Sequence, residues 1–168
     1  MAVLQWYRSV QELDFRRLMS VYEEGNLENA ADRYPHLPQL QGLMQAEQDF
    51  YQYLREIFFP TEGAVYAVGE EAGAYVSALR LEPYRDGLLL SALETAPAYR
   101  RQGYAKKLVT AVLDQLPDKS IYSHVSKRNT PSLRTHISCG FQKISDHATY
   151  LDGSVLTSSY TLCRRAVV

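Results

Sequence analysis

The chain has 168 residues, a net charge of −1 and 46% hydrophobic residues. Its length suffices for one well-buried core, and its near-zero charge excludes the strong electrostatic attraction of proteins that bind nucleic acid or anionic membranes. The two cysteines have neither the spacing of a metal site nor that of a disulfide framework. No apolar run approaches the ~18 residues of a membrane span, and polar residues come too early for a signal peptide. We therefore expect one cytoplasmic domain over residues 1–168, without a metal.

The N-terminal region reads as a strand followed by a helix. The strand is expected over residues 3–10, where Ser9 and Glu12 have the spacing of a capping box that begins the helix. Gly25 is typical of a helix end, and the polar, proline-containing stretch 28–38 predicts a loop.

A second helix is predicted over residues 40–59. Apolar residues recur there at helical spacing, with Leu40, Met44 and Phe58 on one stripe, and Pro60 ends the pattern. Strands are then expected over residues 64–68 and 74–81, because a glycine-rich break between them is typical of a hairpin.

The most informative segment is an apolar strand that leads into a basic turn and then a helix. The strand covers residues 88–96, Pro97 ends it, and Arg100 and Arg101 precede Gly103 and Ala105. The free N–H groups of such a turn and the positive end of the helix dipole point at one spot, where small residues allow a phosphate to approach the backbone. The segment therefore predicts an anion site.

The remaining predicted elements are two helices and three strands. A helix from Ala105 to about Leu116 shows clean apolar spacing, and a strand is expected over residues 121–125. Thr130 and Pro131 are typical of a helix start, with the hydroxyl as N-cap. That helix should close at Gly140. Two further strands, 141–151 and 154–162, are expected around the Asp152-Gly153 turn.

The turn resembles the pyrophosphate-binding motif of the GNAT-type N-acetyltransferases. The family pattern Gln/Arg-x-x-Gly-x-Gly/Ala reads here as Arg100-x-x-Gly103-x-Ala105. The predicted order, β-α-α-β-β-β-α-β-α-β-β, is also the family's order. The resemblance thus implies an α/β fold with a mixed central sheet of about seven strands, in which a splayed strand pair holds CoA.

A second pattern lies in register with the first. The family often has Asn, a small residue three positions on, Tyr seven positions on, and then Gly-Phe; here Asn129, Ser132, His136 and Gly140-Phe141 stand at those offsets. The resemblance implies acetyl-CoA as co-substrate. The residues that it implies for cofactor binding are Glu94, Thr95, Ala96, Arg100, Arg101, Gln102, Gly103, Tyr104, Ala105, Lys106, Asn129 and Ser132.

His136 differs from the family pattern. At this position the family often has a tyrosine, which protonates the leaving thiolate. An imidazolium is a competent acid, so His136 is one candidate for this role. In the alternatives, Tyr150 or Tyr160 supplies the proton, or His136 only packs a helix against the sheet.

The general base has several candidates. Glu94 is a charged residue at the end of an apolar strand. Burying a charge is costly, so a role as the base is one explanation for a glutamate at this position. His124 lies where some family members that acetylate protein N-termini place a glutamate, and a histidine can do this work near neutral pH. Water alone can also deprotonate an amine that arrives partly neutral.

The function expected from the resemblance is acetyl transfer to a primary amine, on a small molecule or a peptide, by direct attack in a ternary complex. One alternative is a catalytically weak acyl-CoA-binding or sensing domain. Another is a nucleotide-binding α/β module, which leaves the second pattern unexplained. Neither nucleic acid nor a membrane is an expected partner, and the chain is expected to be a monomer or homodimer.

Overall fold

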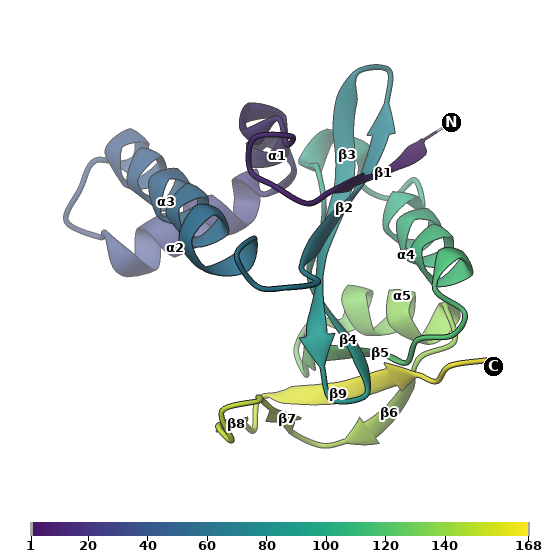
Figure 1. Ribbon diagram of the computed structural model, residues 1–168. Coiled ribbons are helices and arrows are strands. Elements are labelled where there is room, and N and C mark those ends of the chain that lie inside the picture. The colour runs from purple at the N-terminus through teal and green to yellow at the C-terminus, as the bar shows by residue number, and fades with distance from the viewer. Residues whose placement is uncertain (1, 168) are drawn as a thin grey trace.

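The computed structural model describes residues 2–167, which form one mixed seven-stranded sheet with helices on both faces (Figure 1). The strand order is β1-β2-β3-β4-β5-β9-β6, and only the β4–β5 pair is parallel among these neighbours. The helical segments are α1 (Phe15–Val21), α2 (Glu23–Arg33), α3 (Gln39–Tyr53), the π-helical turn η1 (Leu54–Phe58), the 3-10 turn η2 (Pro97–Tyr99), α4 (Tyr104–Gln115) and α5 (Thr130–Ser138). The strands are β1 (Val3–Tyr7), β2 (Val65–Glu71), β3 (Ala74–Tyr84), β4 (Gly87–Thr95), β5 (Ile121–Ser126), β6 (Gln142–Ser145), β7 (Ala148–Thr149), β8 (Val155–Leu156) and β9 (Ser159–Arg164). The predicted mixed α/β sheet of about seven strands is confirmed.

Two hydrophobic clusters lie on opposite faces of this sheet. Apolar residues of α4, among them Val109 and Val112, pack on one face together with Leu79 and Leu90. Residues of α1, α3 and η1 cover part of the other face, where Tyr66 is fully buried, and α2 packs on α3. The strand predicted over residues 88–96 is therefore central, and side chains pack on both of its faces.

The first helix begins later than the capping box predicted. Glu12 N–H donates to Ser9 Oγ at 3.3 Å, so the expected contact forms, but it closes only a turn. The helix itself starts after Asp14, whose carboxylate accepts the N–H of Arg17. The strand that was expected to reach residue 10 ends at Tyr7, because Val10 turns inward to be buried.

The loop predicted over residues 28–38 is wrong for its first part. Helix α2 passes through Gly25 and continues to Arg33. Its Ala30 is buried, and the Cβ of Ala30 lies against Gly42 of α3. This close helix–helix contact is a tertiary stabilisation that outweighs the helix-ending tendency of glycine.

The helix predicted over residues 40–59 is confirmed in its extent, since α3 and η1 together cover it. Its predicted apolar stripe is wrong at the N-terminal end, where Leu40 and Met44 are 69% and 60% exposed. The buried positions there are Gly42 and Ala46, and the absence of a side chain at Gly42 lets α2 pack closely on α3.

The C-terminal strands are shorter than predicted. Instead of one long hairpin around Asp152-Gly153, a small β7–β8 ribbon turns there, while β9 inserts between β5 and β6. Helix α5 is capped one residue earlier than expected, because the side chain of Asn129, not Thr130, accepts the N–H of Ser132 at 3.2 Å. Within residues 2–167, no helix is long and apolar enough to cross a membrane.

Gly87 allows β4 to start directly against the segment before β5. Leu88 N–H donates to Ser120 O at 3.0 Å, and a Cβ at Gly87 would lie 1.9 Å from that same oxygen. We expect Gly87→Ala to lower the free energy of unfolding by at least about 2 kcal/mol, measured by urea denaturation. Gly25→Ala is the matched control: its Cβ would meet nothing within 4 Å, and alanine favours a helix. A Gly87→Ala variant as stable as wild type would contradict this close approach.

Candidate functional site

The parallel strands β4 and β5 separate partway along their length. They pair only from Leu88–Ile121 to Leu90–Ser123, although β4 continues to Thr95 and β5 to Ser126. Beyond this point, their backbone groups no longer bond to each other. The splayed pair that the resemblance implied is present, and it opens at the carboxyl ends of the parallel strands, where α/β sheets commonly bind ligands.

A bulge in β4 lies at the start of the opening. The register with β3 shifts between Ala78 and Arg80, and Ala92 adopts a φ of +54°. The hydroxyl of Tyr22 donates to Ala92 O at 2.7 Å, and the hydroxyl of Tyr66 donates to that of Tyr22 at 2.8 Å. Tyr22, at the junction of α1 and α2, and Tyr66 of β2 thus hold this strained backbone in place.

The turn after β4 has the backbone of an anion cradle. Arg101 and Gly103 both have positive φ, +61° and +80°, and Gly103 is the N-cap of the 12-residue helix α4. A Cβ at Gly103 would meet nothing within 4 Å, so the space in front of the turn is open. The turn and the first turn of α4 therefore offer N–H groups and the positive end of a helix dipole. The residues present fit the pyrophosphate of a CoA thioester.

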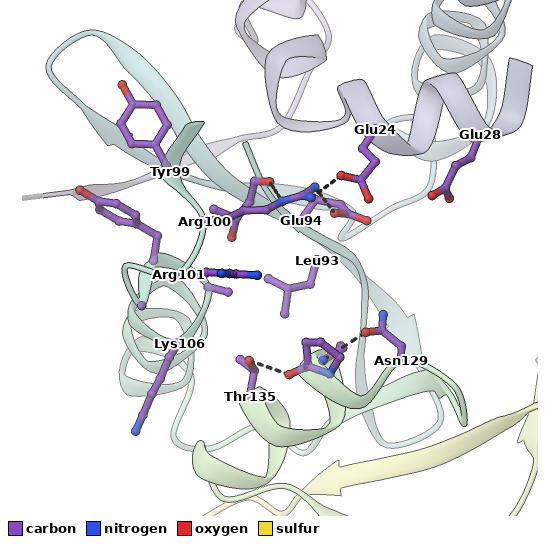
Figure 2. Close-up of a pocket in the computed structure, with 16 residues that line it drawn as sticks. Glu24, Glu28, Leu93, Glu94, Tyr99, Arg100, Arg101, Lys106, Asn129 and Thr135 are labelled. Carbon is purple, nitrogen blue, oxygen red and sulfur yellow. Dashed lines mark hydrogen bonds and ion pairs between the residues drawn. The ribbon is translucent and has the colours of Figure 1, made fainter. Parts of the chain in front are cut away.

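A cavity of about 640 Å³ connects this turn with the splayed strand and α2 (Figure 2). Predicted cofactor residues that line it are Glu94, Thr95, Arg100, Arg101, Gly103, Tyr104, Ala105, Lys106, Asn129 and Ser132. Two predicted residues do not: Gln102 is absent from its wall, and Ala96 lines a neighbouring cavity of about 440 Å³. The structure thus brings together most of what the two sequence patterns predicted.

The wall also contains residues that sequence reasoning missed. Glu28 was assigned to a loop, yet α2 places it one helical turn beyond Glu24, and both line the cavity. Their i, i+4 spacing is the signal that a helical reading of this stretch would have found. Leu93, Tyr99, Pro131 and Thr135 complete the wall.

Arg100 does not reach toward the anion turn. Its guanidinium forms an ion pair with Glu24, lies 4.0 Å from Glu94, and donates through Nε to Thr95 O at 3.3 Å. Figure 2 shows the Arg100 side chain between Glu24 and Glu94, whereas Arg101 extends toward Leu93. Of the two predicted arginines, Arg101 is thus the one whose side chain remains directed into the cavity.

Glu94 is a half-buried carboxylate on the wall. Burial raises its pKa above the ordinary value; Arg100 opposes this effect, and the negative charges of Glu24 and Glu28 add to it. A carboxylate with a raised pKa is a stronger base, and it still attracts a cation when it is ionised. This environment suits a proton acceptor for an amine.

His124 lies on β5 just past the last β4–β5 pair, but it does not line the cavity wall. Its Nε2 is 3.3 Å from the Tyr84 hydroxyl, and its ring contacts the rings of Tyr84 and Tyr150 edge to face. Burial and the nearby Arg85 lower its pKa, so the neutral ring predominates near neutral pH. Its role as a base stays a prediction.

His136 is buried beneath the cavity wall instead of forming part of it. Its Nδ1–H donates to Ser132 O at 2.7 Å, its ring packs edge to face on Phe141, and the buried Nε2 has no hydrogen-bond partner. Burial lowers its pKa, which disfavours the imidazolium. These contacts match the packing interpretation, and its role as an acid stays a prediction.

The buried His136 has a consequence for stability. Because the folded protein resists protonating this ring, while the unfolded chain takes up a proton near pH 6.5, wild-type stability should fall below that pH. When the pH is lowered from ~7.5 to ~5.5, we expect the free energy of unfolding to decrease less for His136→Phe than for wild type. The two decreases, measured by urea denaturation, should differ by up to about 1 kcal/mol. Equal losses in His136→Phe and wild type would show that His136 ionises within the fold.

Within the described part of the chain, no group of three or more His, Cys, Asp or Glu side chains could hold a metal ion.

The chain is similar in sequence to known proteins. A family model described as Acetyltransferase (GNAT) family matches residues 20–141. A [ribosomal protein bS18]-alanine N-acetyltransferase from Haemophilus ducreyi is 37% identical over 75 residues, which cover 41% of this chain and 52% of that protein. The chain thus spans about half the length of this curated relative.

Solved structures share the fold. The ribosomal-protein-S18-alanine N-acetyltransferase from Escherichia coli superposes with a TM-score of 0.65 at 15% identity, covering 100% of this chain and 96% of that one. The PaiA N-acetyltransferase from Thermoplasma acidophilum, solved in complex with coenzyme A, gives a TM-score of 0.62 at 12% identity, covering 97% and 99%. Since the family model spans most of the chain, and the splayed strands and anion turn lie where its motif predicts, the chain belongs to the acetyltransferase (GNAT) family.

Proposed function

We propose that the chain transfers an acetyl group from acetyl-CoA to a primary amine by direct attack in a ternary complex. The observation that carries this proposal is the cavity itself, because the anion turn and the carboxylates of Glu94, Glu24 and Glu28 all line it. A phosphate-bearing donor and a cationic amine therefore have complementary charges at the two sides of a single space. One space for both is what direct transfer needs.

The donor side is built from backbone and a few side chains. The N–H groups from Arg101 to Ala105 would hold the pyrophosphate, with Arg101 adding positive charge. The unpaired backbone of β4 beyond Leu90 would bond to the pantetheine arm, and Asn129 and Ser132 face the same space. The side-chain oxygen of Asn129 accepts the N–H of Ser132 and so caps α5. The side-chain N–H₂ of Asn129 is therefore the group that would bond to this arm. Acetyl-CoA supplies the activated acyl group as a thioester.

The acceptor side must remove a proton and stabilise charge. As the amine nitrogen forms the amide bond and the thioester C–S bond breaks, the amine's extra proton goes to the carboxylate of Glu94. A backbone N–H of the splayed β4 segment would stabilise the oxyanion. The departing sulfur takes up a proton, for which His136, Tyr150 and Tyr160 remain candidates, while His124 and water remain alternatives to Glu94.

The acceptor is an amine of a small molecule or of a peptide N-terminus. The bS18-alanine N-acetyltransferases among the similar proteins favour a peptide, and the carboxylates on α2 favour a cationic group in either case. We further propose that the enzyme works in the cytoplasm as a monomer or homodimer.

The test has two stages. Calorimetric titration with CoA, acetyl-CoA and ATP should show binding of both CoA compounds and none of ATP. An acceptor screen with acetyl-CoA, read as free thiol release, should then show release with amines and none with the matching alcohols. ATP binding without CoA binding would refute the donor site, and CoA binding without release by any amine would refute the acetyl transfer.

A further inference from the structure

A chain of hydrogen bonds between buried side chains ends on the backbone of β4. The Tyr66 hydroxyl donates to the Tyr22 hydroxyl at 2.8 Å, and the Tyr22 hydroxyl donates to Ala92 O at 2.7 Å. Arg80 of β3 forms a hydrogen bond with the Tyr66 hydroxyl. A guanidinium can only donate and a carbonyl can only accept, so every proton in this chain points toward Ala92 O. The charge at the Arg80 end therefore strengthens the bond at the Ala92 end.

Both tyrosines of this chain keep their protons near neutral pH. Their side chains are buried in the same hydrophobic cluster. Burial raises the pKa of Tyr66 to about 12 and raises that of Tyr22 well above its ordinary value. The rings of Tyr53 and Phe58 hold the Arg80 guanidinium at the start of the chain, with centroids 5.0 and 5.7 Å from its central carbon. The chain is thus a fixed donor to the backbone and does not carry a proton along its length.

The carbonyl at the end of the chain belongs to the bulge in β4. Ala92 and Leu93 of β4 together oppose the single β3 residue Leu79, and Ala92 has a φ of +54°. A residue other than glycine is strained in this conformation, which persists only where surrounding contacts hold it. The bond from the Tyr22 hydroxyl is such a contact, and it acts on the carbonyl of the strained residue itself.

The same peptide unit carries the N–H of Leu93. In a planar trans peptide, the Ala92 C=O and the Leu93 N–H point in opposite directions, so the N–H points away from Tyr22. Ala96 N–H donates to Val76 O of β3 at 2.9 Å, and backbone groups alternate along a strand, so those of Leu93 point away from β3. On that side β5 has already separated from β4, and Leu93 lines the cavity (Figure 2). The Leu93 N–H is therefore a donor that faces the opening between the two strands.

We propose that Tyr22 and Tyr66, anchored by Arg80, are positioning residues for acetyl transfer. Their chain fixes and polarises the Ala92–Leu93 peptide, so that the Leu93 N–H is directed at the thioester oxygen and stabilises the charge that develops there. A donor that is already in place costs no reorganisation during the reaction, and a hydrogen bond accepted by the carbonyl of a peptide strengthens its N–H as a donor. This proposal rests on the acetyl transfer proposed above and names the side chains that hold its oxyanion donor.

The experiment uses variants that lose only a hydroxyl, and its first readout does not depend on turnover. Infrared spectroscopy of bound acetyl-CoA with an isotope-labelled acetyl carbonyl measures how strongly the protein polarises that carbonyl. We expect its band to move to lower wavenumber on binding to wild type and to move less in Tyr22→Phe, while calorimetry shows an acetyl-CoA affinity within a few-fold of wild type. In the thiol-release assay, Tyr22→Phe should lower kcat at least about 10-fold. The factor should be the same between pH ~6.5 and ~8.5, because neither tyrosine of the chain titrates there.

Two further variants separate positioning from a loss of packing. Tyr75→Phe is the matched control, because Tyr75 is buried in the same cluster and its hydroxyl accepts the N–H of Asp14, just before α1, at 3.1 Å. It should lower stability in urea denaturation as much as Tyr22→Phe does, yet keep the wild-type band and kcat. Tyr66→Phe should have a smaller effect on both than Tyr22→Phe. The double variant should match Tyr22→Phe alone, because Tyr66 acts only through Tyr22.

Several results would overturn the proposal. They are a carbonyl band that does not move when acetyl-CoA binds to wild type, a wild-type band and kcat in Tyr22→Phe, or an equal loss of kcat in Tyr75→Phe. If Tyr22→Phe does not fold, Tyr66→Phe decides by the same readouts. A band that moves less in Tyr22→Phe, without thiol release by wild type with any amine, would count against acetyl transfer alone. No binding of acetyl-CoA at all would overturn both.

Discussion

Replacing Gly103 with glutamate is expected to weaken CoA binding at least 100-fold in calorimetric titration. Gly103 caps α4 with a φ of +80° and faces open space, so the new side chain enters the position that a phosphate would occupy. There it brings a negative charge to a site built to attract one, and it blocks the approach of the ligand to the backbone. Two additive effects, repulsion and exclusion, make this the largest expected change in donor binding.

Backbone strain is the competing explanation, because glutamate at positive φ is unfavourable in any protein. Gly153 controls for it: its φ is +88°, a Cβ there would also meet nothing within 4 Å, and it lies in the β7–β8 turn, outside the cavity wall. Gly153→Glu should therefore show a similar loss of thermal stability with wild-type CoA affinity. Retained CoA binding in Gly103→Glu would remove the pyrophosphate from this turn.

Replacing Glu94 with glutamine is expected to lower kcat/KM at least 100-fold, while CoA affinity stays within a few-fold of wild type. Glutamine keeps the shape and the backbone contacts of this strand but cannot accept the amine's proton. Burial raises the pKa of Glu94, and its carboxylate is the active form, so wild-type activity should fall as pH drops through this raised pKa. The Glu94→Gln variant should lack this acidic limb in its pH–rate profile.

Glu28→Gln is the matched control, because Glu28 lines the same cavity and carries the same charge. It should cost far less activity. Since the negative charge of Glu28 helps to raise the pKa of Glu94, its removal should move the acidic limb to lower pH. A Glu94→Gln profile that keeps the wild-type limb would assign the proton to His124 or water.

Local signals determined the donor side of the site. A strand that ends at proline, a turn that needs positive φ at Gly103 and a helix that starts there are consecutive in the chain, so no distant contact is needed to assemble them. The same holds for the β2–β3 hairpin and for the apolar helix α4. These predictions succeeded because turn and helix preferences act over a few residues.

Long-range contacts decided most of what local reading missed. Helix α2 passes through Gly25 because Ala30 packs against Gly42, which lies outside any local window. The exposed Leu40 and Met44 show the same limit: apolar spacing reveals an amphipathic helix, but only its neighbours select the face that is buried.

The sequence by itself determined the family, the α/β sheet and the turn that would hold a phosphate, because each depends on residue types at short, fixed spacings. Only the tertiary structure decided that Arg100 pairs with Glu24, that His136 is buried, and that α2 brings Glu28 to the cavity. These features depend on how segments far apart in the chain meet. Their charges and pKa shifts arise from burial and proximity, which exist only once the sheet and its helices have packed together.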